Sequence, residues 1–133
     1  YPQGEIFSHV VGHIGRINQR EIEQLEKSGR IANYRGSDYI GKTGLEQSYE
    51  AALHGTTGVE EVEVDSGGRA VRVLSRTPPV SGNNLVLNLD ARLQEIAYNA
   101  FGERRGALVA IDPRNGGVLA LVSKPGFDPN LFV

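Results

Sequence analysis

The sequence predicts an α+β fold in which a small mixed segment of short helices and a β-hairpin is followed by a strand, a helix and a second hairpin. Three runs with helical spacing follow helix-capping residues, one pair of β-branched runs flanks a two-glycine turn, and one pair of apolar runs flanks a second turn with glycines. Pro78-Pro79 and Gly82 lie between the first hairpin and the run that begins at residue 85, and they predict a turn or linker there. We therefore expect one segment at residues 1–82 and a second, truncated segment at residues 83–133.

The first third of the chain predicts one helix between two irregular stretches. Residues 1–17 hold a short apolar run interrupted by glycines, which predicts a broken strand. Asn18 with Glu21 three residues later is a capping pattern, and the amphipathic helix that it opens is expected to end at Gly29. Residues 30–42 predict a loop, because glycines and tyrosines alternate there.

The next stretch predicts a helix and then a hairpin. Thr43 and Glu46 form a second capping pattern, and apolar residues recur behind them at helical spacing until Gly55. The β-branched runs at 59–64 and 71–74 flank two adjacent glycines. These runs predict a β-hairpin with a solvated face opposite a packed one.

The second segment predicts a strand, a helix and a hairpin. Leucines alternate along residues 85–89, and Asp90 caps an amphipathic helix at 90–101. The runs 107–111 and 118–122 are almost continuously apolar, which predicts strands buried on both faces. One helix cannot cover both faces, so we expect residues outside the chain to complete this core.

Composition narrows the classes of function. The 133 residues carry a formal net charge of -2 with interspersed signs, which offers no broad positive field to nucleic acid or an anionic membrane. Cysteine is absent, so disulfides and thiolate chemistry are excluded. No run of about 18 apolar residues predicts a membrane span. The chain starts at Tyr1 rather than Met, and we expect both ends to be cut from a longer protein.

Lys42-Thr43-Gly44 is the sharpest candidate for catalysis, because a Lys-Thr-Gly triplet is part of the signature of serine β-lactamases and related acyl-serine enzymes. That chemistry also needs a nucleophilic serine in a Ser-x-x-Lys arrangement, and the chain has none. We therefore interpret Thr43 as a helix N-cap whose hydroxyl accepts a backbone N–H, and we predict no catalytic residue here.

Histidines and clustered acids are the candidate metal ligands. His9 and His13 are four residues apart, but Gly12 between them disfavours a shared helix face, and His54 is distant in sequence. We interpret all three as surface or half-buried residues and predict no metal or cofactor site. The clustered acids are Glu60, Glu61, Glu63 and Asp65. Of these, Glu61, Glu63 and Asp65 are expected to lie on the solvated face of the hairpin, where Arg69 and Arg72 can pair with them across the strands.

Residues 36–43 match the full Gly-x-x-x-x-Gly-Lys-Thr pattern of a phosphate-binding loop. The pattern requires a buried strand immediately before Gly36, whereas residues 30–35 are polar. Tyr39 and Ile40 are bulky where the backbone would approach phosphate. A stand-alone nucleotide-binding protein that uses Gly36 to Thr43 remains the alternative function.

Taken together, short segments along the whole chain resemble the class B penicillin-binding proteins. Those of the pedestal region are Tyr1-Pro2 with Gly4, His9-Val10-Val11-Gly12, Gly15-Arg16-Ile17, Ile40 to Glu46, Tyr49-Glu50, Leu53 and Gly55. Those that resemble the entry into the transpeptidase domain are Gly68-Arg69, Leu89-Asp90, Leu93-Gln94, Gly106-Ala107, Ala110 to Pro113, Gly117 to Ser123 and Phe127 to Phe132. The stretch at 40–46 favours the elongation-specific branch, and His13 replaces an expected aromatic residue.

The resemblance implies a periplasmic part of an inner-membrane-anchored D,D-transpeptidase that cross-links peptidoglycan and is acylated by β-lactams. It implies that residues 1–82 are a pedestal that positions the catalytic domain and docks the peptidoglycan synthase and cell-shape scaffold proteins of the elongation machinery. The anchor, the serine segment, the Ser-x-Asn segment and the catalytic Lys-Thr-Gly strand are expected outside this chain. The uncovered strands of the chain also predict self-association.

Overall fold

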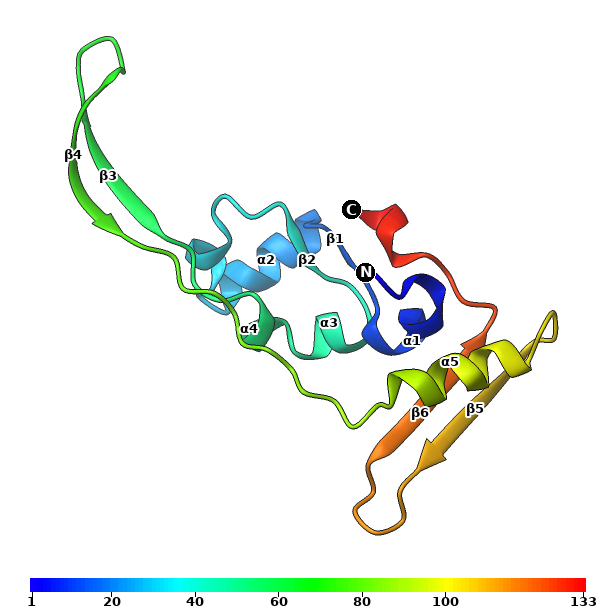
Figure 1. The fold of residues 1–133 in the computed structure, drawn as a ribbon. Helices are drawn as coiled ribbons and strands as arrows, with labels where there is room; N and C mark the ends of the chain where they lie inside the picture. Colours follow the sequence, from blue (N-terminus) through cyan, green and yellow to red (C-terminus); the bar gives the residue numbers. More distant parts are fainter. The chain divides into compact units, whose positions relative to one another are not determined.

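The computed structural model describes residues 1–133 and confirms a mixed α+β fold with small sheets (Figure 1). The chain forms two compact units, one made of residues 1–17, 38–50 and 85–133 and the other of residues 18–37 and 51–84. Every sheet is a two-stranded antiparallel pair. The division at residue 82 that the sequence predicts stays a prediction. None of the helices is both long and apolar enough to span a bilayer.

The N-terminal part of the first unit is helical where the sequence predicts a broken strand. A 3-10 turn, η1 (Gly4–Phe7), leads directly into the short helix α1 (Ser8–Val11). The predicted strand is confirmed only at Ile14–Arg16 and was wrong for the apolar run before Gly12, where the buried Ser8 hydroxyl donates to the Glu5 carbonyl at 2.9 Å and closes a helical turn. Gly12, at φ 78°, then ends the helix.

A small sheet follows, and it corrects the loop predicted at 30–42. Strand β1 (Ile14–Arg16) pairs antiparallel with β2 (Tyr39–Gly41), with Ile14 opposite Gly41. The predicted single helix behind Thr43 is also divided. Helix α3 (Gly44–Ser48) ends at Tyr49, whose dihedral angles leave the helical region, and α4 (Glu50–Leu53) follows.

The C-terminal part of the first unit is a helix on a hairpin (Figure 1). Helix α5 (Ala91–Ala100) begins at Asp90, whose side chain accepts from the Leu93 N–H at 3.0 Å, as predicted. Strands β5 (Gly106–Ile111) and β6 (Val118–Lys124) form the predicted second hairpin, and η3 (Pro129–Phe132) closes the chain. The strand predicted at 85–89 is absent, because only at Asp90 does this stretch reach β6, where its N–H donates to the Leu119 carbonyl.

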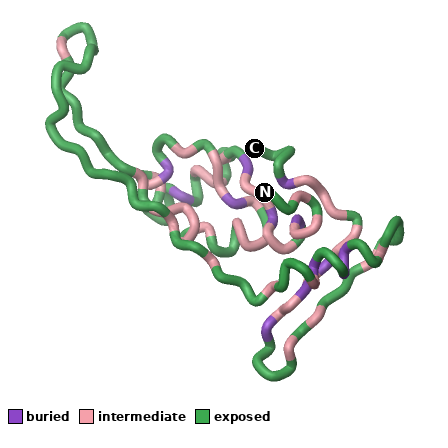
Figure 2. Tube along the Cα trace, viewed as in Figure 1, coloured by how far each residue is buried: buried purple, intermediate pink, exposed green.

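Burial on this hairpin is one-sided, contrary to the predicted burial of both faces (Figure 2). Ala120 and Val122 of β6 are buried, and Val122 packs with Ala97 and Tyr98 of α5. On β5, by contrast, Val109 and Ile111 are each 55% exposed. A single helix, α5, covers only one face of this two-stranded sheet, so the other face stays exposed.

The second unit combines short helices with a long hairpin. Helix α2 (Gln19–Lys27) has the predicted capping box, with the Asn18 side chain accepting from the Glu21 N–H and the Glu21 carboxylate accepting from the Asn18 N–H. A 3-10 turn, η2 (Ile31–Tyr34), lies within the stretch predicted as loop. Leu25 and Tyr34 are the buried hydrophobic residues of this unit.

The predicted hairpin forms from β3 (Val59–Val64) and β4 (Ala70–Thr77). Glu61 lies opposite Ser75 and Val62 opposite Val73, with a register shift between these two pairs. The prediction of one packed face was wrong, since every residue of both strands is exposed (Figure 2). The apolar side chains are between 41% and 63% exposed; they are Val59, Val62, Val64, Val71, Val73 and Leu74.

Candidate functional site

Lys42-Thr43-Gly44 lies where two segments of backbone cross, between β2 and α3. The Lys42 N–H donates to the His13 carbonyl at 2.9 Å. Thr43 occupies the N-cap position, but its hydroxyl contacts His13 Nδ1 at 3.1 Å and accepts no helix N–H, so the predicted cap hydrogen bond was wrong. A Cβ atom at Gly12 would overlap the Thr43 carbonyl. The geometry gives this triplet a structural role as a tight backbone crossing.

The residues that match a phosphate-binding loop run into a paired strand. A 3-10 turn, rather than a buried strand, precedes Gly36, and the second half of the pattern is β2. The Gly41 N–H donates to a carboxylate oxygen of Glu50 at 2.7 Å. The N–H groups of Gly41 and Lys42, which would face phosphate in such a loop, therefore already donate to acceptors within the protein.

His9 and His13 meet at one small depression rather than on a helix face. His9 Nε2 contacts the Pro125 carbonyl at 2.9 Å, and its ring stands edge-on to Phe127 at 5.3 Å. His13 stacks on Phe132 with 4.1 Å between ring centroids. The depression that they line with Phe127 has a volume of about 210 Å³. The two histidine rings contact the rings of Phe127 and Phe132, and these contacts pack the residues around α1 against the C-terminal segment.

His54 is half-buried in the second unit. Its ring stacks on Tyr34 at 4.1 Å, with Nδ1 at 3.3 Å from Asn33 Nδ2 and Nε2 at 3.1 Å from the Ser37 hydroxyl. Asn33 also donates to the Gly55 carbonyl and accepts from the Thr57 N–H, each at 2.8 Å. Sequence reasoning missed Asn33, because no pattern marks a side chain that joins four backbone or side-chain groups across a turn.

Three carboxylates of the acidic cluster pair with arginines on β4 or in the turn before it. Arg72 pairs with Glu63, and Arg76 lies 3.5 Å from Glu60. Asp65 accepts from the Arg69 N–H and, at 3.0 Å, from the Arg69 guanidinium. The hydrogen bond from the Arg69 N–H is the main cause that lowers the pKa of Asp65. Nowhere in residues 1–133 do three His, Cys, Asp or Glu side chains gather in an arrangement that could hold a metal ion.

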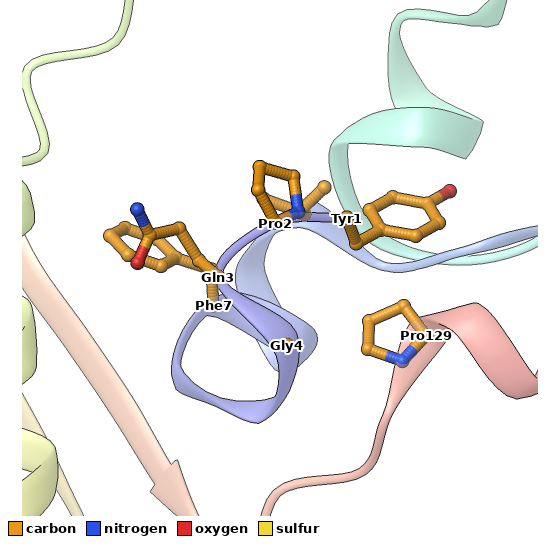
Figure 3. A pocket seen from close by; sticks show the side chains of 7 residues that line it. Tyr1, Pro2, Gln3, Gly4, Phe7 and Pro129 are labelled. Atoms are coloured by element: carbon orange, nitrogen blue, oxygen red, sulfur yellow. The ribbon is translucent and has the colours of Figure 1, made fainter.

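An apolar pocket of about 230 Å³ opens beside the first turn of the chain (Figure 3). Tyr1 and Pro129 lie on one side of it, and Phe7 with Gln3 lies on the other. The Tyr1 hydroxyl donates to Glu46 at 3.1 Å and accepts from the Ile14 N–H at 2.9 Å. Burial, and then the Glu46 carboxylate, raise the pKa of Tyr1. The surface that lines this pocket is apolar, and it holds no cluster of titratable groups.

A larger, polar pocket of about 380 Å³ lies at the C-terminal end of α5. We call it the basic pocket; its lining includes Glu5, Tyr98, Glu103, Arg104, Arg105 and Lys124. The ammonium of Lys124 is 4.3 Å from the centroid of the Tyr98 ring. Sequence reasoning missed this pocket, because only the packing of α5 on β6 brings Lys124 beside the two arginines. The only sequence feature that could have indicated the pocket was that Arg104 and Arg105 are adjacent.

Comparison with known proteins decides the family. The family described as "Penicillin-binding Protein dimerisation domain" matches residues 1–87. The chain belongs to this family. The finding confirms the resemblance that the sequence predicts, and the similarity extends beyond the matched domain to the whole chain.

Relatives of this penicillin-binding family place the chain near the transpeptidases called PBP2. It is 48% identical over 133 residues to the peptidoglycan D,D-transpeptidase MrdA of Escherichia coli K12, covering 100% of this chain and 21% of that protein. The Pseudomonas aeruginosa PBP2 in complex with WCK 5153 has a TM-score of 0.79 at 47% identity, over 100% of this chain and 25% of that one. A complex between PBP2 and MreC from Helicobacter pylori has a TM-score of 0.80 at 32% identity, over 100% and 24%. The chain thus spans about a fifth of its curated relative.

Proposed function

We propose that the chain is a non-catalytic part of a peptidoglycan D,D-transpeptidase that functions in cell-wall elongation and cell shape. The observation that carries the proposal is its 48% identity to MrdA along its entire length while spanning 21% of that protein. The chain holds no Ser-x-x-Lys segment, and its one Lys-Thr-Gly triplet is a backbone crossing. The serine chemistry therefore belongs to the remainder of the full-length protein, which we place in the periplasm as part of an inner-membrane-anchored protein.

Within this proposal, residues 1–82 form the pedestal and residues 83–133 begin the transpeptidase domain. The match to the dimerisation family extends to residue 87, close to this division. The exposed β5 supports the second part of the proposal, because Val109 and Ile111 leave an apolar face for further elements of a larger domain. The pedestal would hold that domain away from the membrane.

The pedestal is also proposed to dock the cell-shape scaffold and the peptidoglycan synthase. A PBP2 from Helicobacter pylori has been solved in complex with MreC, and this chain shares its fold over 100% of its length. The apolar face of the β3–β4 hairpin, carrying Val62 and Val73, supports a docking role because nothing within the chain covers it. We assign this face to the scaffold protein.

Binding of the chain to the MreC homologue of the same organism tests the assignment. Val73→Lys places a charge on the apolar face, and Ser75→Lys places the same charge on the opposite face, next to Glu61. We expect Val73→Lys to weaken binding at least about tenfold and Ser75→Lys to leave it unchanged, because burying an unpaired charge at an interface is costly. Equal affinities for both variants would place the scaffold elsewhere.

Self-association is a further part of the proposal, since β5 and the β3–β4 hairpin both present unpaired strand edges. Light scattering of the isolated chain at increasing concentration tests it. A rise in apparent mass is expected, and a strictly monomeric species at high concentration would count against it.

A further inference from the structure

We propose that the basic pocket binds an oxyanion, either a carboxylate or a phosphate group of a small ligand. The pocket lies within the first unit, where the loop after α5 meets the end of β6. Three cations line it, from Arg104, Arg105 and Lys124, against two carboxylates, from Glu5 and Glu103. The inference goes beyond the proposed function and does not depend on partner docking.

Lys124 is held in position without being neutralised. Its ammonium donates to the Tyr98 carbonyl at 3.4 Å and lies over the Tyr98 ring. Tyr98 is itself buried, so the partner that orients the lysine is fixed by the core. A neutral carbonyl and a ring leave the positive charge of Lys124 available to a ligand.

One of the two carboxylates is already engaged. Glu5 accepts from the Tyr98 hydroxyl at 3.1 Å, and burial together with this carboxylate raises the pKa of Tyr98, which keeps the hydroxyl protonated as a donor. Glu103 is exposed on the loop. With three cations against two carboxylates, the formal charge lining the pocket is positive.

Some arginines of the chain pair with its own carboxylates, whereas others, Arg92 among them, do not. Arg69, Arg72 and Arg114 each pair with a carboxylate of the chain. Arg104 and Arg105 form no ion pair in the structure of residues 1–133. A guanidinium presents donors in a fork that matches the two oxygens of a carboxylate or phosphate, so Arg104 and Arg105 suit an oxyanion ligand at this pocket.

The dimensions suit a small ligand rather than a single ion. About 380 Å³ is within the range of ordinary ligand pockets. The Tyr98 ring and Pro125 add an apolar wall beside the cations. The C-terminal end of α5 contributes a partial negative charge, which the three cations outweigh.

NMR titration of the 133-residue chain tests the proposal, with inorganic phosphate in one series and acetate in another. We expect saturable shifts of the Arg104 and Arg105 side-chain Nε–H signals, with a dissociation constant on the order of 1 mM. Sodium chloride at matched ionic strength controls for screening. The series with the tighter binding identifies which oxyanion the pocket prefers.

Variants separate a built site from general surface charge. Arg104→Gln with Arg105→Gln should weaken binding at least tenfold, and Lys124→Gln should weaken it similarly. Arg92→Gln removes an exposed charge from α5 outside the pocket and should change nothing. The proposal is overturned if chloride reproduces the shifts, if neither anion shifts the arginine signals, or if Arg92→Gln weakens binding as much as the double variant.

Discussion

The side-chain amide of Gln94 forms two hydrogen bonds with the backbone of Leu121, accepting from its N–H at 2.8 Å and donating to its carbonyl at 2.6 Å. The same Nε2 also donates to the Ile6 carbonyl at 2.9 Å. Gln94 is 0% exposed. One buried amide therefore takes the place of a neighbouring strand along β6 and joins α5 to the N-terminal segment.

Gln94→Leu should destabilise the first unit by about 2–4 kcal/mol, because it leaves buried backbone groups of Leu121 and Ile6 without partners. Urea unfolding followed by signals of residues in α5 measures this loss. Gln47→Leu is the control, since Gln47 is exposed on α3, and it should change stability by less than about 0.5 kcal/mol. Equal midpoints for the two variants would show that the Gln94 network contributes no net stability.

In the second unit, the side chain of Asn33 joins backbone groups in the way that Gln94 does in the first unit. Asn33→Ala removes its hydrogen bonds to Gly55 and Thr57 and should cost about 1–3 kcal/mol in the free energy of unfolding. Hydrogen exchange of the Thr57 amide should accelerate in parallel. Asn84→Ala, at an exposed position of the same unit, is expected to leave both quantities unchanged, and a similar loss there would contradict a specific role for Asn33.

The crossing at Lys42-Thr43-Gly44 makes Gly12 intolerant of a side chain. Gly12→Ala should destabilise by more than about 2 kcal/mol, since it adds a clash with the Thr43 carbonyl to the cost of a positive φ. Gly116 also has a positive φ, 75°, but open space around it. Thermal unfolding should therefore show a much smaller loss for Gly116→Ala, and losses of equal size would remove the clash from the explanation.

Asp65 and Asp112 both have a lowered pKa, but the main cause is a backbone N–H for Asp65 and an arginine side chain for Asp112. The Arg114 side chain is the main cause that lowers the pKa of Asp112, whereas the Arg69 backbone N–H is the main cause that lowers the pKa of Asp65. NMR titration should show Arg114→Gln returning the pKa of Asp112 toward its ordinary value. Arg69→Gln should leave most of the lowering at Asp65, and a full return there would contradict the backbone cause.

The sign of the pH dependence follows from the same two groups. Because both carboxyls have a lowered pKa in the folded chain, their contribution to stability is complete above the ordinary aspartate pKa of about 4. It is lost as the pH falls through the folded-state values. Acid unfolding of the Arg114→Gln variant should accordingly depend less on pH in this range than that of the unaltered chain.

Local chemistry made part of the fold predictable from the sequence. The Asn18 capping box, the Asp90 cap and both hairpins depend on residues close together in the chain, and the structure confirms them. The strand predicted at 85–89 is absent from the structure. Alternating leucines can give a strand one apolar face, but they do not provide a neighbouring strand to pair with.

The candidate sites were less accessible to sequence reasoning. Thr43 has a capping pattern, yet its hydroxyl contacts His13, thirty residues earlier. Gln94 and the basic pocket likewise arise where α5 packs on β6. These features depend on tertiary contacts, which neither residue spacing nor local propensity encodes.

Acylation by a fluorescent penicillin tests the central claim most directly. The 133-residue chain is compared with the full-length protein that contains it, and covalent labelling is read after denaturing electrophoresis. Our account predicts that the full-length protein is labelled and that the chain alone is not, because the serine chemistry lies in the remainder of the protein. Labelling of the isolated chain would contradict the account and would place an acylated nucleophile within residues 1–133.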